Sequence, residues 1–146
     1  MSDSVVGTIM TNQGIGEALA EIDVGLLRTN VGDKYVSREL VKENLNVGGE
    51  TSGHVIQREF SESGDANIAL IQTLTAFSDL DATMTDIQKK IYYWPHKLQS
   101  YDVKNQALRS SNEFNQKIDD LQKSNTDSRI SVRKSGTEAK LRVMVE

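Results

Sequence analysis

The chain contains no cysteine and one proline, Pro95, among its 146 residues. Without cysteine it can form no disulfide, no thiolate metal site and no cysteine nucleophile, and it suits a reducing compartment. It also has no apolar run near the roughly 18 residues needed to cross a bilayer. Residues 1–4 lack the basic and apolar regions of a signal peptide. We therefore expect a cytoplasmic protein with no membrane partner.

Positive charge is scarce in the chain as a whole and unevenly distributed. The net charge is −4, which argues against nucleic acid as a partner because binding to its backbone needs clustered Lys and Arg. Residues 1–91 hold 7 Lys and Arg against 14 Asp and Glu, whereas residues 92–146 hold 10 against 7. An anionic ligand is therefore favoured by the second part of the chain.

The first part of the chain alternates between strand and helix patterns. A β-branched run at residues 4–10 predicts a strand, followed by apolar residues at helical spacing, and residues 25–29 predict a second short strand, followed by a loop into a helix. The second helix is expected over about 35–43, and residues 46–55 form a third unit of strand and loop. This order is typical of an α/β domain with a mixed, mostly parallel sheet.

Two further helices and a junction end this part. Asp65 is a plausible N-cap for the first helix, and Thr83 with Asp86 resembles a capping box for the second. Aromatic residues then precede the lone proline, which ends a helix. We place a domain boundary there, with an α/β domain over 1–94 and a second domain over 95–146.

The second part reads as a small α+β domain with an antiparallel sheet. A strand is expected over 97–103 and a helix over about 111–124. Alternating residues at 129–133 and 140–146 then predict a β-hairpin with a polar loop between its strands.

That loop carries the parts of an anion site. Arginine matches a phosphate or carboxylate bidentately, hydroxyls donate to the remaining oxygens, and glycine lets backbone N–H groups point inward. The alternative is an ordinary surface turn, for which Ser, Gly and Thr are common. The candidate phosphate-binding residues are Arg133, Ser135, Gly136, Thr137 and Arg142.

A second candidate loop lies in the first domain. Residues 48–54 place three glycines around Glu50, Ser52 and His54, where a carboxylate beside a hydroxyl can bind vicinal sugar hydroxyls. Alternatively, Glu50 caps a neighbouring helix or pairs with a lysine, Ser52 belongs to a turn and His54 is a satisfied histidine. So many glycines cost chain entropy that a plain turn would not require, which favours a site.

Four ordered segments together carry a resemblance to a known family. Residues 6–12, 28–36 and 48–54, and the loop at 133–138 with the strand after it, resemble the C-terminal half of the bacterial phosphoglucosamine mutases. These enzymes belong to the α-D-phosphohexomutase superfamily. The sequence Val-Gly-Asp-Lys-Tyr-Val and the Ser-Gly-Thr loop favour the glucosamine branch over the phosphomannomutase and phosphoglucomutase branches, which stay the alternative.

The resemblance implies an enzyme of four domains around one cleft, of which this chain holds most of the third and fourth. It implies that Glu50, Ser52 and His54 contact the sugar of a glucosamine phosphate, and that the 133–142 residues bind its phosphate. The fourth domain would have a fold like the TATA-binding protein. A phosphoserine and a magnesium ion would be held by the first two domains, so the missing N-terminal domains are the expected partner.

The chain itself contains neither the Ser-His nucleophile motif nor the Asp-Gly-Asp-x-Asp-Arg metal loop of this superfamily. Phosphoryl transfer needs an in-line nucleophile and a cation to neutralise developing charge. We therefore expect the isolated chain to be catalytically inactive and to bind no cofactor. Two other functions stay open: a non-catalytic module that binds sugar phosphates or a protein partner, and a remnant without function.

Overall fold

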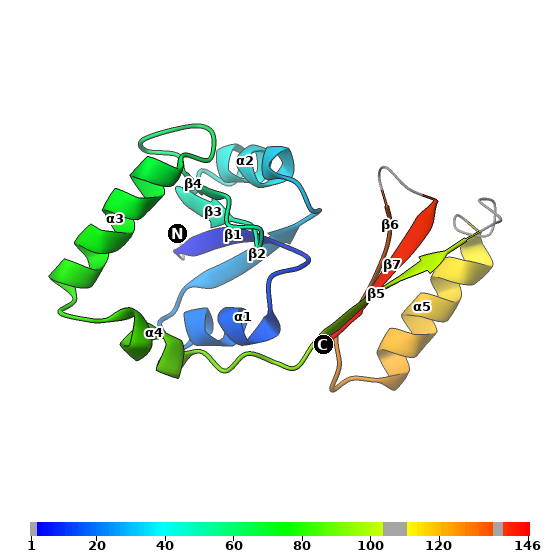
Figure 1. Cartoon of the computed structure of the whole chain (residues 1–146). Coiled ribbons are helices and arrows are strands. Elements are labelled where there is room, and N and C mark those ends of the chain that lie inside the picture. The colour runs from blue at the N-terminus through cyan, green and yellow to red at the C-terminus, as the bar shows by residue number, and fades with distance from the viewer. Residues whose placement is uncertain (1–2, 104–110, 136–138) are drawn as a thin grey trace. The chain divides into compact units, whose positions relative to one another are not determined.

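The computed structural model describes residues 3–103, 111–135 and 139–146. The chain forms two compact units, residues 1–93 and 94–146 (Figure 1). No helix in the described part of the chain is both long and apolar enough to span a bilayer.

The first unit is an α/β layer around a four-stranded sheet. The strand order is β2-β1-β3-β4; β1 pairs in parallel with both β2 and β3, and β4 pairs antiparallel with β3. Its elements are β1 (Ser4–Thr8), α1 (Gln13–Ala20), β2 (Gly25–Thr29), α2 (Asp33–Lys42), β3 (Val47–Gly49), β4 (Val55–Gln57), α3 (Ala66–Asp79) and α4 (Met84–Lys90).

The core of this unit lies between α2 and one face of the sheet. Val36 and Leu40 of α2 are fully buried against Val6 of β1 and Ile56 of β4. A Cβ atom on Gly48 of β3 would lie 2.7 Å from Val36 Cγ1, so the missing side chain lets α2 approach the sheet closely. Burial of these four side chains stabilises the packing of α2 on the sheet.

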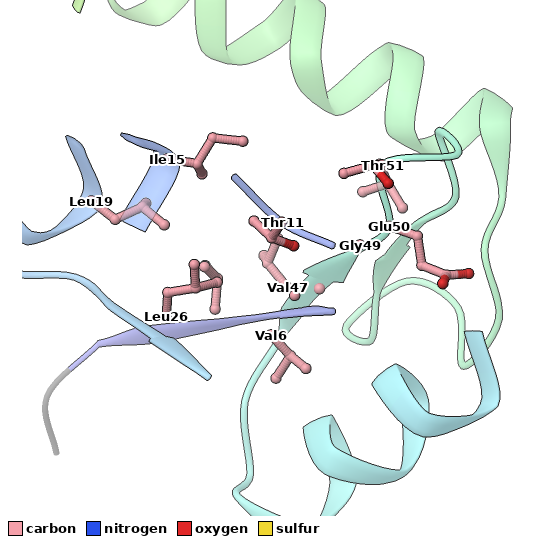
Figure 2. Close-up of a pocket in the computed structure, with 13 residues that line it drawn as sticks. Val6, Thr11, Ile15, Leu19, Leu26, Val47, Gly49, Glu50 and Thr51 are labelled. Carbon is pink, nitrogen blue, oxygen red and sulfur yellow. The ribbon is translucent and has the colours of Figure 1, made fainter. Parts of the chain in front are cut away.

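The opposite sheet face carries an open apolar groove of about 340 Å³ (Figure 2). Its lining includes Leu26 of β2, Val47 of β3, and Ile15 and Leu19 of α1. The backbone at Tyr92 packs closely against one side of α1, since a Cβ on Gly14 would lie 1.7 Å from the Tyr92 carbonyl oxygen. The segment after α4 therefore rests directly on α1.

The second unit is a three-stranded antiparallel sheet with one helix. The strand order is β5-β7-β6, which places the last strand in the centre. Gln122 of the helix anchors the start of β6, donating to the Ser128 carbonyl oxygen at 2.6 Å and accepting from the Ile130 N–H at 2.7 Å. The elements are β5 (Lys97–Asp102), α5 (Asn112–Ser124), β6 (Ile130–Lys134) and β7 (Lys140–Val145).

The predicted fold class is confirmed in both parts. The Asp65 side chain accepts hydrogen bonds from two N–H groups at the start of α3, and Thr83 and Asp86 form a reciprocal capping box on α4. The first strand is shorter than predicted and ends at Thr8, because the Thr11 N–H turns back to donate to the Thr8 carbonyl oxygen at 2.8 Å. The strand and loop predicted over residues 46–55 form an antiparallel hairpin of β3 and β4, which makes the sheet mixed.

Candidate substrate-binding sites

The order of the strands marks one edge of the first sheet as a place for a ligand. From β1 the chain crosses to β2 on one side, and then returns past β1 to β3 on the other. In open α/β sheets, ligands bind outside the carboxyl ends of the strands where this direction reverses. Here that point lies between the ends of β1 and β3, beside residues 9–12 and Glu50.

The turn after β1 is held by its own side chains. The Thr8 N–H donates to Thr11 Oγ1 at 3.0 Å, and the Met10 N–H donates to Thr8 Oγ1 at 3.2 Å. Asn12 Oδ1 accepts from the Gly14 N–H at 3.0 Å and so caps α1. Thr8, Thr11 and Asn12 are all buried, so this turn forms a fixed edge for the site.

The loop between β3 and β4 brings the three predicted sugar-contacting residues together. The Gly53 N–H donates to the Glu50 carbonyl oxygen at 3.0 Å, and the Glu50 N–H donates to the His54 carbonyl oxygen at 2.9 Å. Gly53 has φ +94°, a conformation that favours glycine. Ser52 Oγ lies 3.0 Å from His54 Nδ1, and both side chains are exposed.

Glu50 is half-buried and has a partner that the sequence did not indicate. Its Oε1 accepts a hydrogen bond from the Gly32 N–H at 2.8 Å, at the N-cap position of α2. One carboxylate oxygen therefore binds the N-terminal end of α2, which agrees with the alternative role of Glu50 in capping a neighbouring helix. In Figure 2 the carboxylate points away from Ile15 and Leu19 of the apolar groove.

The second unit places two arginines side by side. Arg133 of β6 and Arg142 of β7 are directly opposite in the antiparallel register, and both are half-buried. Burial, and next the positive charge of Arg142, lower the pKa of the Arg133 guanidinium below its ordinary value. Arg133 Nε is buried without a hydrogen-bond partner among the described residues. An anion would satisfy this group and offset the repulsion.

Two serines lie beside the arginine pair. Ser100 of β5 is opposite Arg142, so Ser100, Arg142 and Arg133 form one row across a single sheet face. Sequence reasoning missed Ser100, since only the register reveals it. The half-buried Ser135 donates its N–H to the Lys140 carbonyl oxygen at 2.9 Å and closes the hairpin. Gly136 and Thr137 lie outside the described residues.

A metal ion is not matched by the described part of either unit. Within residues 3–103, 111–135 and 139–146, no three His, Asp or Glu side chains gather where they could hold one.

Two family models together match the whole chain. The model described as "Phosphoglucomutase/phosphomannomutase, alpha/beta/alpha domain III" matches residues 1–93. The model described as "Phosphoglucomutase/phosphomannomutase, C-terminal domain" matches residues 81–146.

Curated relatives extend this similarity. The phosphoglucosamine mutase of Thermosipho africanus is 38% identical over 145 residues, a match that covers 99% of this chain and 33% of the relative. That of Leuconostoc mesenteroides is 36% identical over 146 residues, covering 99% of this chain and 32% of the relative. The chain thus spans about a third of the length of these relatives.

Solved structures show the same fold. Aspergillus fumigatus N-acetylphosphoglucosamine mutase in complex with GlcNAc-6P and magnesium aligns with a TM-score of 0.81 at 19% identity, covering 99% of this chain and 38% of that one. The substrate complex of an N-acetylglucosamine-phosphate mutase aligns with a TM-score of 0.78 at 21% identity, covering 100% and 35%.

Proposed function

Because the chain belongs to the phosphoglucomutase/phosphomannomutase family, we propose that it is the substrate-holding, C-terminal part of a cytoplasmic phosphoglucosamine mutase. The complete enzyme would interconvert glucosamine 6-phosphate and glucosamine 1-phosphate. The choice of hexose is supported by the names of the relatives and by the glucosamine form of the motifs.

The β3–β4 loop of the first unit would bind the sugar. Its carboxylate and hydroxyl can accept from and donate to ring hydroxyls, and its place beside the carboxyl ends of β1 and β3 suits a ligand. The reaction moves phosphate from one end of the ring to the other, so these contacts must serve two orientations of the sugar. Glu50 can accept from a ring hydroxyl, and Ser52 can both donate and accept, in either orientation.

The arginine row of the second unit would bind the phosphate that is not reacting. This proposal is supported by the pair of opposed, half-buried arginines and by Arg133 Nε, which has no hydrogen-bond partner among the residues that the structure describes. Ser135, Gly136 and Thr137 would donate to the other phosphate oxygens, as the resemblance implies. Binding energy gained at this remote group would position the sugar for transfer.

The chemical step would come from the missing N-terminal domains. They would supply the phosphoserine and the magnesium ion, which neutralises charge as the phosphoryl group is transferred. This chain would orient the sugar and hold its free phosphate, and alone it would be inactive.

Kinetics of a chimaera test the proposal. This chain would replace the matching C-terminal third of the Thermosipho africanus enzyme, and interconversion of the two glucosamine phosphates would be measured. Arg133→Ala should raise KM and lower kcat, with kcat/KM falling by roughly a hundredfold because a charge-assisted contact is lost. Lys117→Ala, which removes an exposed cation on α5, is the matched control. An active chimaera with unchanged kinetics for Arg133→Ala would reject the phosphate role.

A further inference from the structure

The contact between Gly32 and Glu50 crosses the predicted sugar site. Gly32 follows β2, and Glu50 follows β3, while β1 lies between these two strands in the sheet. The 2.8 Å hydrogen bond from the Gly32 N–H to Glu50 Oε1 therefore spans the carboxyl end of β1. It joins the two sides of the point where the strand order reverses.

The bond leaves half of the carboxylate for another partner. Glu50 makes no other side-chain hydrogen bond to the residues that the structure describes, so Oε2 can accept from a ligand. The backbone of Glu50 is fixed separately by its hydrogen bonds with Gly53 and His54. With Oε1 also fixed, the side chain has little freedom left, and little side-chain entropy would be lost on binding.

Glycine is required on the donor side of the contact. Gly32 has φ +134°, where other residues are strained, and a Cβ there would lie 3.2 Å from Tyr35 Cδ2. The Glu50 carboxylate accepts from the amide of the N-cap residue itself, at the end of α2 where the helix dipole favours a negative charge. α2 also approaches the sheet closely at Gly48, two residues before Glu50.

We propose that Gly32 is a positioning residue of the sugar site, whose amide holds one Glu50 oxygen so that the other is presented to a substrate hydroxyl. The inference rests on the proposed function for its ligand. The hydrogen bond between Gly32 and Glu50, here called the tether, does not depend on the proposed function and can be tested without any ligand.

Hydrogen exchange of the Gly32 amide in the full chain tests the tether. Glu50→Ala should speed this exchange about tenfold, because a hydrogen bond to a charged acceptor is lost. Glu50→Gln keeps an acceptor oxygen and should preserve most of the protection. Ser52→Ala, in the same loop, should change nothing at Gly32. Equal exchange in Glu50→Ala and the unaltered chain would overturn the proposal.

Ligand titration tests the purpose of the tether. Gly32→Ala should weaken glucosamine 6-phosphate binding about tenfold through loss of Glu50 positioning, and leave binding of inorganic phosphate unchanged. The control, Asp23→Ala, also removes a residue of positive φ, 58°, but at the opposite end of β2, and should weaken neither ligand. Equal affinities in Gly32→Ala and Asp23→Ala would overturn the positioning role.

Failure of the proposed function has a different signature. The unaltered chain would then bind glucosamine 6-phosphate no better than inorganic phosphate, while Gly32 exchange would still respond to Glu50→Ala. That combination would confine the contact to helix capping and would contradict its role at a sugar site.

Discussion

Gly14 and Gly16 lie on the same helix, α1, but face different surroundings. A Cβ on Gly14 would lie 1.7 Å from the backbone oxygen of Tyr92, which cannot move as a side chain could. A Cβ on Gly16 would have its nearest neighbours at 3.4 Å, in ordinary contact with Leu26 and Arg28. The same substitution should therefore have opposite effects at the two positions.

Gly14→Ala should destabilise the first unit by about 1 to 3 kcal/mol, as expected for overpacking against backbone. Gly16→Ala should stabilise it by roughly 0.5 to 1 kcal/mol, because alanine is the better helix former. Denaturant unfolding of the full chain followed by circular dichroism measures both. Equal effects at the two positions would show that the Tyr92 segment does not rest on α1.

An ion pair joins the two ends of the hairpin in the second unit, where the backbones of Arg129 and Glu146 also exchange two hydrogen bonds. Arg129 Nε donates to Glu146 Oε2 at 2.7 Å, and the Glu146 side chain is 1% exposed. Arg129→Met should destabilise this unit by roughly 2 to 4 kcal/mol, since it removes the guanidinium that pairs with a buried carboxylate.

Two variants sharpen that test. Arg129→Met combined with Glu146→Leu should recover most of the lost stability, because an apolar pair removes the buried charge. Lys117→Met breaks the exposed pair with Glu113 and should change stability by less than about 0.5 kcal/mol. A double variant no more stable than Arg129→Met would contradict this account of the pair. Thermal unfolding of all three variants decides the matter.

At the scale of elements, α4 has a pH-sensitive start. The Thr83 hydroxyl, and next the Thr83 backbone N–H, donate to Asp86 and lower its pKa below the ordinary value of 3.8. A pKa lowered by folding contributes stability above the unfolded value, and that stability is lost as the pH falls through the lowered folded value. The first turn of α4 should therefore fray as the pH drops below about 3.8.

Amide hydrogen exchange at residues 84–86, measured between pH 5 and pH 2 after correction for intrinsic rates, checks this expectation. Asp86→Asn should fray at every pH and lose the acid-dependent step, since its amide carries no charge to titrate. A step that persists in Asp86→Asn would assign it to another group.

The elements that could be predicted from sequence are those with local signals. The short strand runs of β1 and β2, the alternation of β6 and β7, and the caps at Asp65 and Thr83 depend on neighbouring residues and were confirmed. The β3–β4 hairpin has only three residues per strand, two of them glycines in β3, so its pairing was not predicted.

The contacts within the candidate sites depend on residues far apart in the chain. Gly32 and Glu50 meet because β2 and β3 lie on either side of β1 in the sheet, and no local sequence pattern indicates that order. Likewise, the position of Ser100 beside Arg142 follows from the register of β5 on β7. The residues of both candidate sites were proposed from sequence, whereas the partners that orient them are visible only in the fold.

At the scale of the whole molecule, the two units differ in the chemical groups that each would bind. The first unit carries a net negative charge and offers hydrogen-bonding groups, and the second is net positive and offers two arginines. A neutral or cationic sugar ring suits the first surface and a phosphate suits the second. Each unit should therefore respond to a different part of glucosamine 6-phosphate.

Amide chemical shifts of the full chain, titrated with glucosamine 6-phosphate and with inorganic phosphate, test this division most directly. We predict that the sugar phosphate perturbs Glu50, Ser52 and His54 as well as Arg133 and Arg142, whereas inorganic phosphate perturbs only the two arginines. Arg142→Ala should abolish the response to inorganic phosphate. If the sugar phosphate left Glu50, Ser52 and His54 unperturbed, or if both ligands perturbed the same residues, the result would contradict the account.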